Sequence, residues 1–129
     1  MLLKSEILAI AAKLKHGAEV LKLHQELLDL GVTSYYYSVT EGTHQYYNDA
    51  KDLVEEKSDC GGLFVVRIAS REAAEQAVLK YRNYAYDFPT FCRALASSGV
   101  YEYVADLAKG KIAYIDQTGN EIFVEALKS

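Results

Sequence analysis

Cysteine, proline and tryptophan are scarce in this sequence of 129 residues, which contains two, one and none of them. Two cysteines are too few for a disulfide framework, so the fold must be held together by its hydrophobic core. One proline and eight glycines leave little composition for a disordered linker. Residues 1–129 are therefore predicted to form a single domain.

Positive charge is also scarce, because 14 basic residues stand against 18 acidic ones and the net charge is −4. This balance argues against nonspecific binding of DNA or RNA, which needs a basic face. No apolar run approaches the roughly 18 residues of a membrane span. Lys4 and Glu6 interrupt the apolar N-terminal stretch, which is atypical of a secretory signal. We expect a cytoplasmic protein with reduced thiols and with neither a membrane nor a nucleic acid as partner.

Half of the residues are hydrophobic, and their spacing predicts a regular series of elements in the first half of the chain. This half is predicted to form helices over 2–15 and 20–30, and strands over 33–40, 43–47 and 63–68. Between the last two strands, residues 48–58 are polar and charged, which indicates a loop with a short helix that begins at Asp49.

The second half repeats this order. One helix is predicted to begin after the N-cap Ser70 and another after the N-cap Asp87, because Pro89 forces a new start. Three strands are predicted to end the chain, over 101–107, 111–116 and 120–126. Gly31 and Gly99 each follow the apolar stripe of a helix, so both are predicted to end that helix with a positive φ.

Six identical residues recur at a separation of 68 positions: Leu27 and Leu95, Gly31 and Gly99, Val32 and Val100, Tyr35 and Tyr103, Gly42 and Gly110, Tyr46 and Tyr114. The third predicted strands correspond at a separation of 58 instead, as Phe64 does with Ile122. The first half is therefore predicted to carry about ten extra residues near 48–60. We favour an internal duplication over two convergent helix–hairpin units, because glycines and tyrosines both keep register.

The predicted fold class is α+β. Two helix–helix–β–β–β repeats, over about 2–69 and 70–129, would form two three-stranded meanders in one antiparallel sheet. Helices would cover one face of this sheet, and a pseudo-twofold axis would relate the two halves.

Several stretches of the second half resemble a known family: 87–93 (DFPTFCR), 96–100, 103–107, 119–121 and 124–125. They are similar to the YbcV-like proteins, a bacterial family called domain of unknown function 1398 and sometimes labelled "phage envelope protein". The first half matches this family through residues 31–35 and 43–47. The resemblance implies no activity.

Cys92 is the first candidate for chemistry, because exposed N–H groups in the first turns of a helix lower the pKa of a thiol. Against this, Cys92 lies on the apolar stripe of its helix, together with Phe88 and Leu95. Cysteine is among the most buried residue types, so we favour a core position over a reactive thiol.

Four further residues are weak candidates for a binding site: His44, Tyr46, Asp87 and Tyr114. His44 and Tyr46 share one face of a strand, where a partly buried histidine bonded to a tyrosine would suffice as an explanation. Asp87 is explained by helix capping. No histidine pair and no cysteine pair has the spacing of a metal site, and nothing in the sequence implies a cofactor.

The helix-covered sheet face is predicted to carry Tyr35, Tyr37, Val39, Phe64, Val66, Ile68, Tyr103, Ala105, Leu107, Ile122 and Val124. The opposite face would carry the apolar residues Tyr36, Val65, Val104 and Phe123, interleaved with Ser34, Ser38, Arg67, Glu102, Asp106 and Glu125. This mixture is too apolar for a fully solvated face, so we expect a homodimer through this face or through the strand edge beside it. A base-stacking role for Tyr36 would need more basic neighbours than this face offers.

The sequence names no function. We expect a small binding or regulatory module that associates with itself, and whether it is an enzyme stays open. The alternative is an enzyme or a ligand-binding protein with a pocket where the halves meet, and a phage-related structural component is a second alternative. A pocket that contains two or more of the five candidate residues would favour the first alternative.

Overall fold

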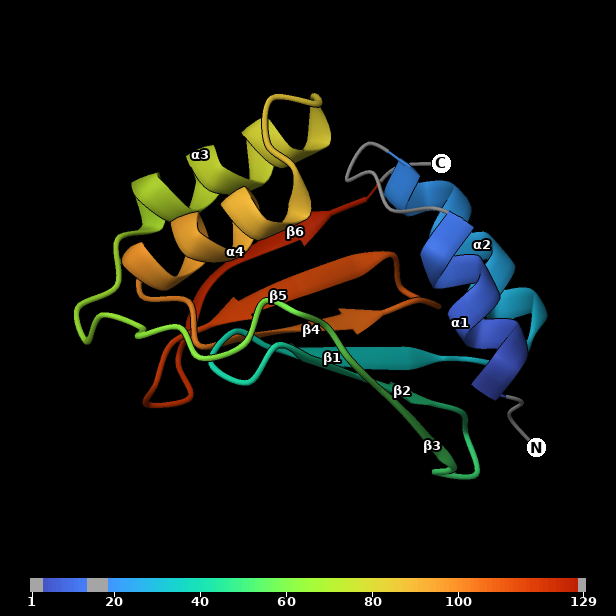
Figure 1. The fold of residues 1–129 in the computed structure, drawn as a ribbon. Helices are drawn as coiled ribbons and strands as arrows, with labels where there is room; N and C mark the ends of the chain where they lie inside the picture. The colour runs from blue at the N-terminus through green and yellow to red at the C-terminus, as the bar shows by residue number, and fades with distance from the viewer. Residues whose placement is uncertain (1–3, 14–18, 128–129) are drawn as a thin grey trace.

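The computed structural model describes residues 4–13 and 19–127, which form four helices and one six-stranded sheet (Figure 1). The first series is α1 (Lys4–Lys13), α2 (Val20–Asp29), β1 (Ser34–Ser38), β2 (Thr43–Tyr47) and β3 (Leu53–Lys57). The second series is α3 (Arg71–Arg82), α4 (Phe88–Ser97), β4 (Glu102–Asp106), β5 (Lys111–Ile115) and β6 (Glu121–Ala126). This mixture of helices with an antiparallel sheet confirms the predicted α+β class.

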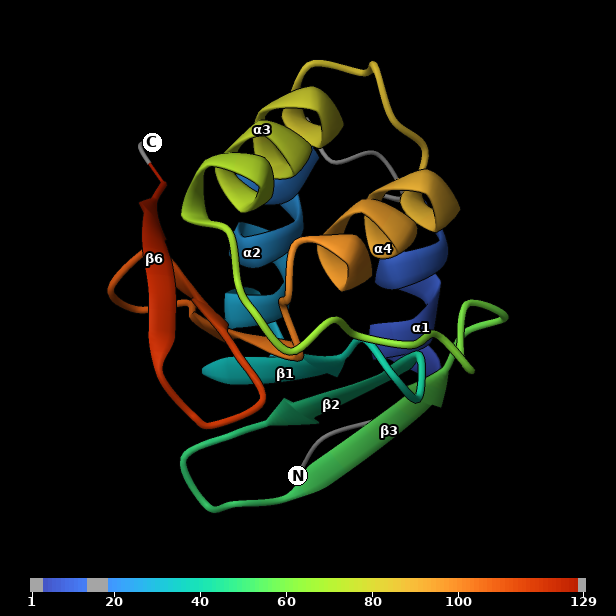
Figure 2. The same cartoon turned by 90° about the vertical axis from the view of Figure 1, so that its left-hand side faces the viewer.

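The sheet has the strand order β3-β2-β1-β4-β5-β6, and every neighbouring pair is antiparallel. Each half supplies one three-stranded meander, and the pairing of β1 with β4 joins them. Figures 1 and 2 show all four described helices on one side of the sheet, with α1 and α2 as one pair and α3 and α4 as the other.

Helix ends follow the polar residues that the sequence places there. The Ser70 hydroxyl accepts a hydrogen bond from the N–H of Ala73 and so caps α3. The Asp87 carboxylate accepts one from the N–H of Thr90 and caps α4. Helix α3 ends at Arg82, and Ala85 beyond it is exposed. Of the helix predicted over 2–15, residues 2–3 and 14–15 lie outside the described residues, and Ile7 of α1 is fully buried.

Two glycines end helices as predicted. Gly31, with φ 94°, follows α2, and Gly99, with φ 86°, follows α4. In each case the next residue donates its N–H back into the helix, Val32 to the carbonyl of Leu27 and Val100 to that of Leu95. Both turns lead directly into a sheet strand.

The predicted short helix in 48–58 is wrong, because Leu53–Lys57 forms β3. This strand lies at the edge of the sheet and pairs only with β2. Val54 is its one buried residue, while Leu53, Glu55 and Lys57 are exposed. An edge strand with a single buried side chain has too little apolar alternation to be recognised by sequence pattern.

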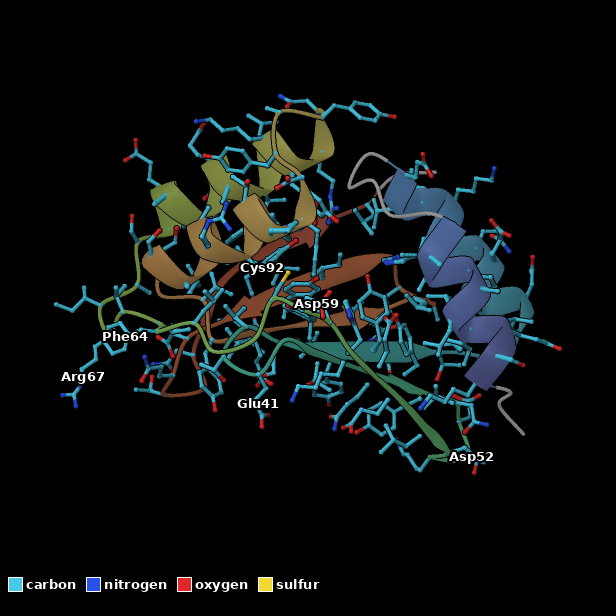
Figure 3. The ribbon with its side chains drawn as sticks, in the orientation of Figure 1. Glu41, Asp52, Asp59, Phe64, Arg67 and Cys92 are labelled. Atoms are coloured by element: carbon cyan, nitrogen blue, oxygen red, sulfur yellow. The ribbon has the colours of Figure 1, made fainter. Side chains whose placement is uncertain are left out.

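The predicted strand over 63–68 is also wrong, because this segment is irregular and belongs to no sheet. Only Val65 is buried, while Phe64 and Ile68 are 80% and 87% exposed. Phe64 and Arg67 project outward at the side of the molecule (Figure 3). The segment is bonded to α4 instead, since Val66 donates its N–H to the carbonyl of Ala96.

The helix-covered sheet face carries the six residues predicted there from β1, β4 and their flanks, and all are buried: Tyr35, Tyr37, Val39, Tyr103, Ala105 and Leu107. On β6 the prediction is wrong. Phe123 lies on this face and stacks on Tyr114 with ring centroids 4.6 Å apart, whereas Val124 pairs with Ala113 on the other face. A register shift between Tyr114 and Ile115 causes the exchange, because a shift of one residue turns every following side chain over.

From the second helix of each half onward, elements at equivalent places are 68 residues apart. This holds for both ends of α2 and α4, of β1 and β4, and of β2 and β5, and for the first residues of β3 and β6. The third strands therefore keep the separation of 68. The predicted change to 58, with about ten extra residues in the first half, is wrong because β3 rather than 63–68 is the third strand.

The junction of β1 and β4 is symmetric in its register. Tyr36 lies opposite Val104, its own equivalent at a separation of 68. Beyond the two strand ends, Val39 donates to the carbonyl of Tyr101 and Leu107 donates to that of Thr33, both at 3.0 Å. Val39 corresponds to Leu107 and Thr33 to Tyr101 at the separation of 68, so the two hydrogen bonds are equivalent in the two halves.

We predict that alanine is tolerated better at Gly31 than at Gly99. Both substitutions force alanine into a left-handed conformation, at a cost of about 1–2 kcal/mol. At Gly31 no atom lies within 4 Å of the added Cβ, whereas at Gly99 this carbon would lie 2.6 Å from the Cα of Ala69. Urea unfolding should therefore show a loss for Gly99→Ala that exceeds the loss for Gly31→Ala by about 1 kcal/mol or more. Equal losses would contradict the close approach at Gly99.

Candidate functional site

A cavity of about 490 Å³ opens between the two helix pairs, above the helix-covered face of the sheet. Its described walls and floor consist of Ala11, Ala12, Val20, Leu23, Tyr35, His44, Tyr46, Glu56, Ser58, Asp59, Cys60, Tyr81, Arg82, Phe88, Pro89, Phe91 and Tyr103. Both halves contribute, so the cavity exists only where they meet. Its volume lies within the range of roughly 300–1,000 Å³ that is usual for small-molecule sites.

Two of the five candidate residues line this cavity. His44 and Tyr46 project from β2 onto the helix-covered face, and their rings stack with centroids 5.7 Å apart. Asp87 caps α4 and is exposed, and Tyr114 is fully buried beside α3 and β6. Cys92 is fully buried, and its side chain points from α4 toward the sheet (Figure 3).

His44 is surrounded by aromatic rings and is neutral near pH 7. Burial lowers the pKa of its imidazole to about 4. The nearest ring is that of Tyr37, at 4.4 Å between centroids, and the ring of Phe88 stacks on the imidazole at 5.9 Å. Its Nδ1 atom is buried and has no hydrogen-bond partner in the protein, because the Oε1 atom of Glu56 is 3.7 Å away. A buried polar atom without a partner is costly and indicates a missing one.

The tyrosines of the floor remain protonated. Burial raises the pKa of Tyr35 and of Tyr46 well above the ordinary value, and the Glu56 carboxylate beside Tyr46 adds to its shift. Burial also raises the pKa of Tyr81 to about 12. The cavity therefore presents neutral phenols, which can donate hydrogen bonds, within an apolar wall.

Arg82, which lines the cavity, forms an ion pair that joins α3 to β6. The Arg82 guanidinium donates to both carboxylate oxygens of Glu125, at 2.9 and 3.0 Å, and both side chains are mostly buried. The Tyr114 hydroxyl donates to the same carboxylate at 2.8 Å. Arg82 is the one cationic residue among the described lining residues, and this pairing neutralises its charge.

A second buried histidine lies next to this ion pair. The Nε2 atom of His24 is 2.7 Å from the hydroxyl of Tyr35, and His24 is 4% exposed. Burial, together with the Arg82 cation, lowers the pKa of His24 to about 4. The sequence did not single out His24, Arg82 or Glu125, because nothing in their local pattern shows which strand or helix they meet.

The segment that follows β3 brings acidic side chains to the cavity. Glu56 on β3 and Asp59 just after it both line the cavity, together with Ser58 and Cys60. Glu56 retains 31% exposure of its side chain, and Asp59 is exposed. With the Arg82 charge neutralised by Glu125, these carboxylates make the field in the cavity negative.

The arrangement is suited to recognition. It combines an aromatic wall, neutral hydroxyl groups, one unpartnered imidazole nitrogen and two carboxylates near each other. Among the described residues, no three His, Cys, Asp or Glu side chains come together as they would around a metal ion. No helix within 4–13 or 19–127 has the length and apolar character that a membrane crossing requires.

Residues 9–126 match the model of a family described as protein of unknown function (DUF1398). The chain belongs to the DUF1398 family. The match includes both halves and every described residue that lines the cavity, and it confirms the predicted membership in domain of unknown function 1398. The YbcV-like and phage-envelope labels stay predictions. No curated protein matches the chain. Because the family description names no activity, the function has to be argued from the cavity itself.

We predict that His24 and His44 reduce the stability of the protein as the pH falls from about 6.5 to 4. Both imidazoles have a pKa of about 4 in the folded protein, against an ordinary value of 6.5 in the unfolded chain, so the unfolded chain binds more protons in this window. His44→Phe keeps an aromatic ring but removes the titration. Between pH 6.5 and 5, urea unfolding should show the wild type losing up to about 2 kcal/mol more than this variant. Identical pH profiles, or an NMR titration of His44 near pH 6.5, would contradict the prediction.

Proposed function

We propose that the protein binds a small organic cation with an aromatic or other apolar body in the cavity between the two helix pairs. The observation that carries this proposal is a 490 Å³ cavity that combines aromatic walls with carboxylates. It develops the alternative of a ligand-binding protein with a pocket where the halves meet, since His44 and Tyr46 both line the cavity.

The walls support an apolar ligand body. Tyr81 and Phe91 stack with centroids 4.1 Å apart, and Phe88 and Tyr103 stand beside them. Aromatic faces attract cations through their quadrupole, at about 0.5–2 kcal/mol per favourable contact. A flat or branched amine could therefore use these rings for both its apolar and its charged parts.

The charges in the cavity favour a ligand with a positive charge. Glu56 and Asp59 would attract an ammonium group, whereas the guanidinium of Arg82 is already held by two hydrogen bonds to Glu125. A carboxylate ligand would face two like charges without a cation to receive it. The chain as a whole is also acidic, with a net charge of −4.

His44 supplies a further point of contact. A neutral imidazole has one N–H donor and one acceptor nitrogen, and the buried Nδ1 atom has no partner in the protein. A polar group of the ligand near Nδ1 would supply the missing hydrogen bond. Such a bond would offset the cost of burying Nδ1 without a partner in the protein.

Thermal-shift screening with matched compounds tests this proposal. Aromatic amines, neutral analogues and carboxylates of the same ring system are compared near pH 7. We predict that the amines raise the melting temperature in a concentration-dependent way. At a ligand concentration of 100 times Kd, the free energy of unfolding should increase by about 2.7 kcal/mol. Shifts from carboxylates alone would contradict the proposed charge, and no shift from any compound would contradict the proposed class of ligand.

Two tryptophan variants test whether the amine that raises the melting temperature binds in the cavity. Leu23 lines the cavity from α2, so Leu23→Trp should fill part of it and remove the amine-induced shift. Leu21 is exposed on the same helix and does not line the cavity, so Leu21→Trp is the matched control. A shift that survives Leu23→Trp would place the ligand elsewhere.

We also infer that the two halves arose by internal duplication and are related by a pseudo-twofold axis between Tyr36 and Val104. The separation of 68 between equivalent elements supports this, as do the two exchanged hydrogen bonds beside β1 and β4. Lys51 and Gly119, again 68 apart, both have a positive φ. The cavity would then lie between two copies of one ancestral unit. The cytoplasmic location and the phage-component alternative stay predictions.

We propose in addition that two copies pair through the open sheet face, which no described helix covers. Tyr36, Val104, Ala113 and Val124 form a row across β1, β4, β5 and β6 on this face. Tyr36 and Val124 are 40% and 43% exposed. Charges of both signs flank the row, and twofold pairing can set Lys111 and Glu102 of the two copies against each other.

This face differs from the predicted one, because four of its expected members lie elsewhere. Val65 is buried in the irregular segment, and Phe123 and Glu125 lie on the helix-covered side. Arg67 belongs to no strand and projects at the side of the molecule. Tyr36 and Val104 remain on the open face as predicted.

We predict a mass of twice 14.4 kDa in light scattering coupled to size-exclusion chromatography. Tyr36→Glu combined with Val104→Glu should reduce this mass to that of one chain, because two carboxylates would be buried against an apolar partner. Leu79→Glu, at an exposed position of α3, should leave the mass unchanged. A wild-type mass of 14.4 kDa would refute the dimer, and a dimer that survives the double substitution would refute this face.

A further inference from the structure

The two halves supply equivalent positions to the cavity but different residue types. Among the described residues that line it are three pairs whose members are 68 positions apart: Val20 and Phe88, Leu23 and Phe91, Tyr35 and Tyr103. In the floor the two equivalent residues are identical, whereas in the walls α2 has aliphatic side chains where α4 has aromatic ones. A ligand would meet two chemically different walls, which favours a single orientation.

The wall on the side of α1 and α2 is aliphatic. It consists of Ala11, Ala12, Val20 and Leu23, and no charged or hydrogen-bonding side chain of these two helices lines the cavity in the part of the chain that the structure describes. Contact with such a wall removes apolar surface of a ligand from water and requires no particular ring geometry. This wall therefore suits a flexible aliphatic chain.

Much of the ring surface on the opposite side is already in contact with protein groups. Tyr81 stacks on Phe91 with centroids 4.1 Å apart, and the guanidinium carbon of Arg82 lies over the Tyr81 ring, 5.5 Å from its centroid. The ring of Phe88 stacks on the imidazole of His44 with centroids 5.9 Å apart. A ligand ring would thus gain less from stacking here than the number of aromatic residues suggests.

The carboxylate of Glu56 lies on the α4 side of the floor. Glu56 is directly opposite His44 in the pairing of β2 with β3, and its Oε1 atom is 3.7 Å from the imidazole that stacks on Phe88. The segment that carries Asp59 is held on both sides by backbone hydrogen bonds to the turn between β1 and β2. An ammonium group is therefore attracted to this side, rather than to the aliphatic wall.

We propose that the cavity selects alkylammonium ions, amines with an unbranched aliphatic body, over aromatic amines. This selection rests on the proposed function, because it specifies the ligand of the same site. The ammonium group lies beside Glu56 and Asp59, and the chain crosses the floor to the wall of α1 and α2. The Tyr35 hydroxyl is 2.7 Å from the Nε2 atom of His24 on α2, so this part of the floor lies below that wall.

Isothermal titration calorimetry of the full chain with butyl-, pentyl-, hexyl- and heptylammonium tests the selection. Benzylammonium is the aromatic probe, because it has as many non-hydrogen atoms as heptylammonium. We expect the affinity to increase about fourfold with each methylene group that the wall buries. Heptylammonium should bind more tightly than benzylammonium, and octanoate, which carries the same chain on a carboxylate, should not bind.

The outcomes separate this selection from the proposed function. If benzylammonium binds as tightly as heptylammonium, or if the affinity does not increase along the series, the selection is wrong although the cavity still binds organic cations. If no amine binds, or if octanoate binds as tightly as heptylammonium, the proposed function is wrong as well.

Two variants locate the two ends of the ligand. Leu23→Phe gives α2 the residue type of the equivalent Phe91, so the gain in affinity per methylene group should stop at a shorter chain. Leu21→Phe, at an exposed position of the same helix outside the cavity, is the matched control and should keep the gain. Glu56→Gln should weaken the binding of all four alkylammonium ions by a similar factor.

Two results would overturn the proposed orientation. They are a full gain per methylene group in Leu23→Phe and unchanged affinities in Glu56→Gln. The wild-type series decides the class of ligand even if a variant does not fold.

Discussion

The pairing of β1 with β4 is the contact on which the rest of the structure depends. Without it the chain would be two separate meanders, each with its own pair of helices. The ring of Tyr37 stacks on that of Tyr103 across this junction, with centroids 5.2 Å apart. Because both helix pairs pack above this one joined sheet, the space between them becomes the cavity (Figure 1). The aromatic floor thus has a structural role and also forms the candidate site.

Sequence pattern predicted the elements that bury a continuous stripe or carry a distinct end signal. Both α4 and the turn at Gly99 belong to this group, because Asp87, Pro89 and the glycine mark the boundaries. Prediction from sequence pattern failed where an element buries few side chains or where the strand register is irregular. β3 buries only Val54, and the shift beside Tyr114 turned Phe123 toward the helices. Neither feature leaves a trace in the local order of apolar and polar residues.

The site was predictable only where its residues share one strand. His44 and Tyr46 are two positions apart on β2, so period-two alternation placed both on one face. The ion pair of Arg82 with Glu125 joins residues 43 positions apart, and its formation depends on the same shift that turned Phe123 inward. Tertiary contacts of this kind can be predicted only after the topology is known.

The two edges of the sheet bear on how the protein avoids fibrous aggregation. An open edge strand presents unpaired N–H and C=O groups to which another chain can add. Here the outer edges are β3, with Glu55 and Lys57 exposed, and β6, whose register is interrupted beside β5. Charged side chains and an irregular register both disfavour the addition of a further strand. This antiparallel sheet, with tyrosines on its four inner strands, can therefore remain a closed unit in a crowded solution, because growth of the sheet at either edge is discouraged.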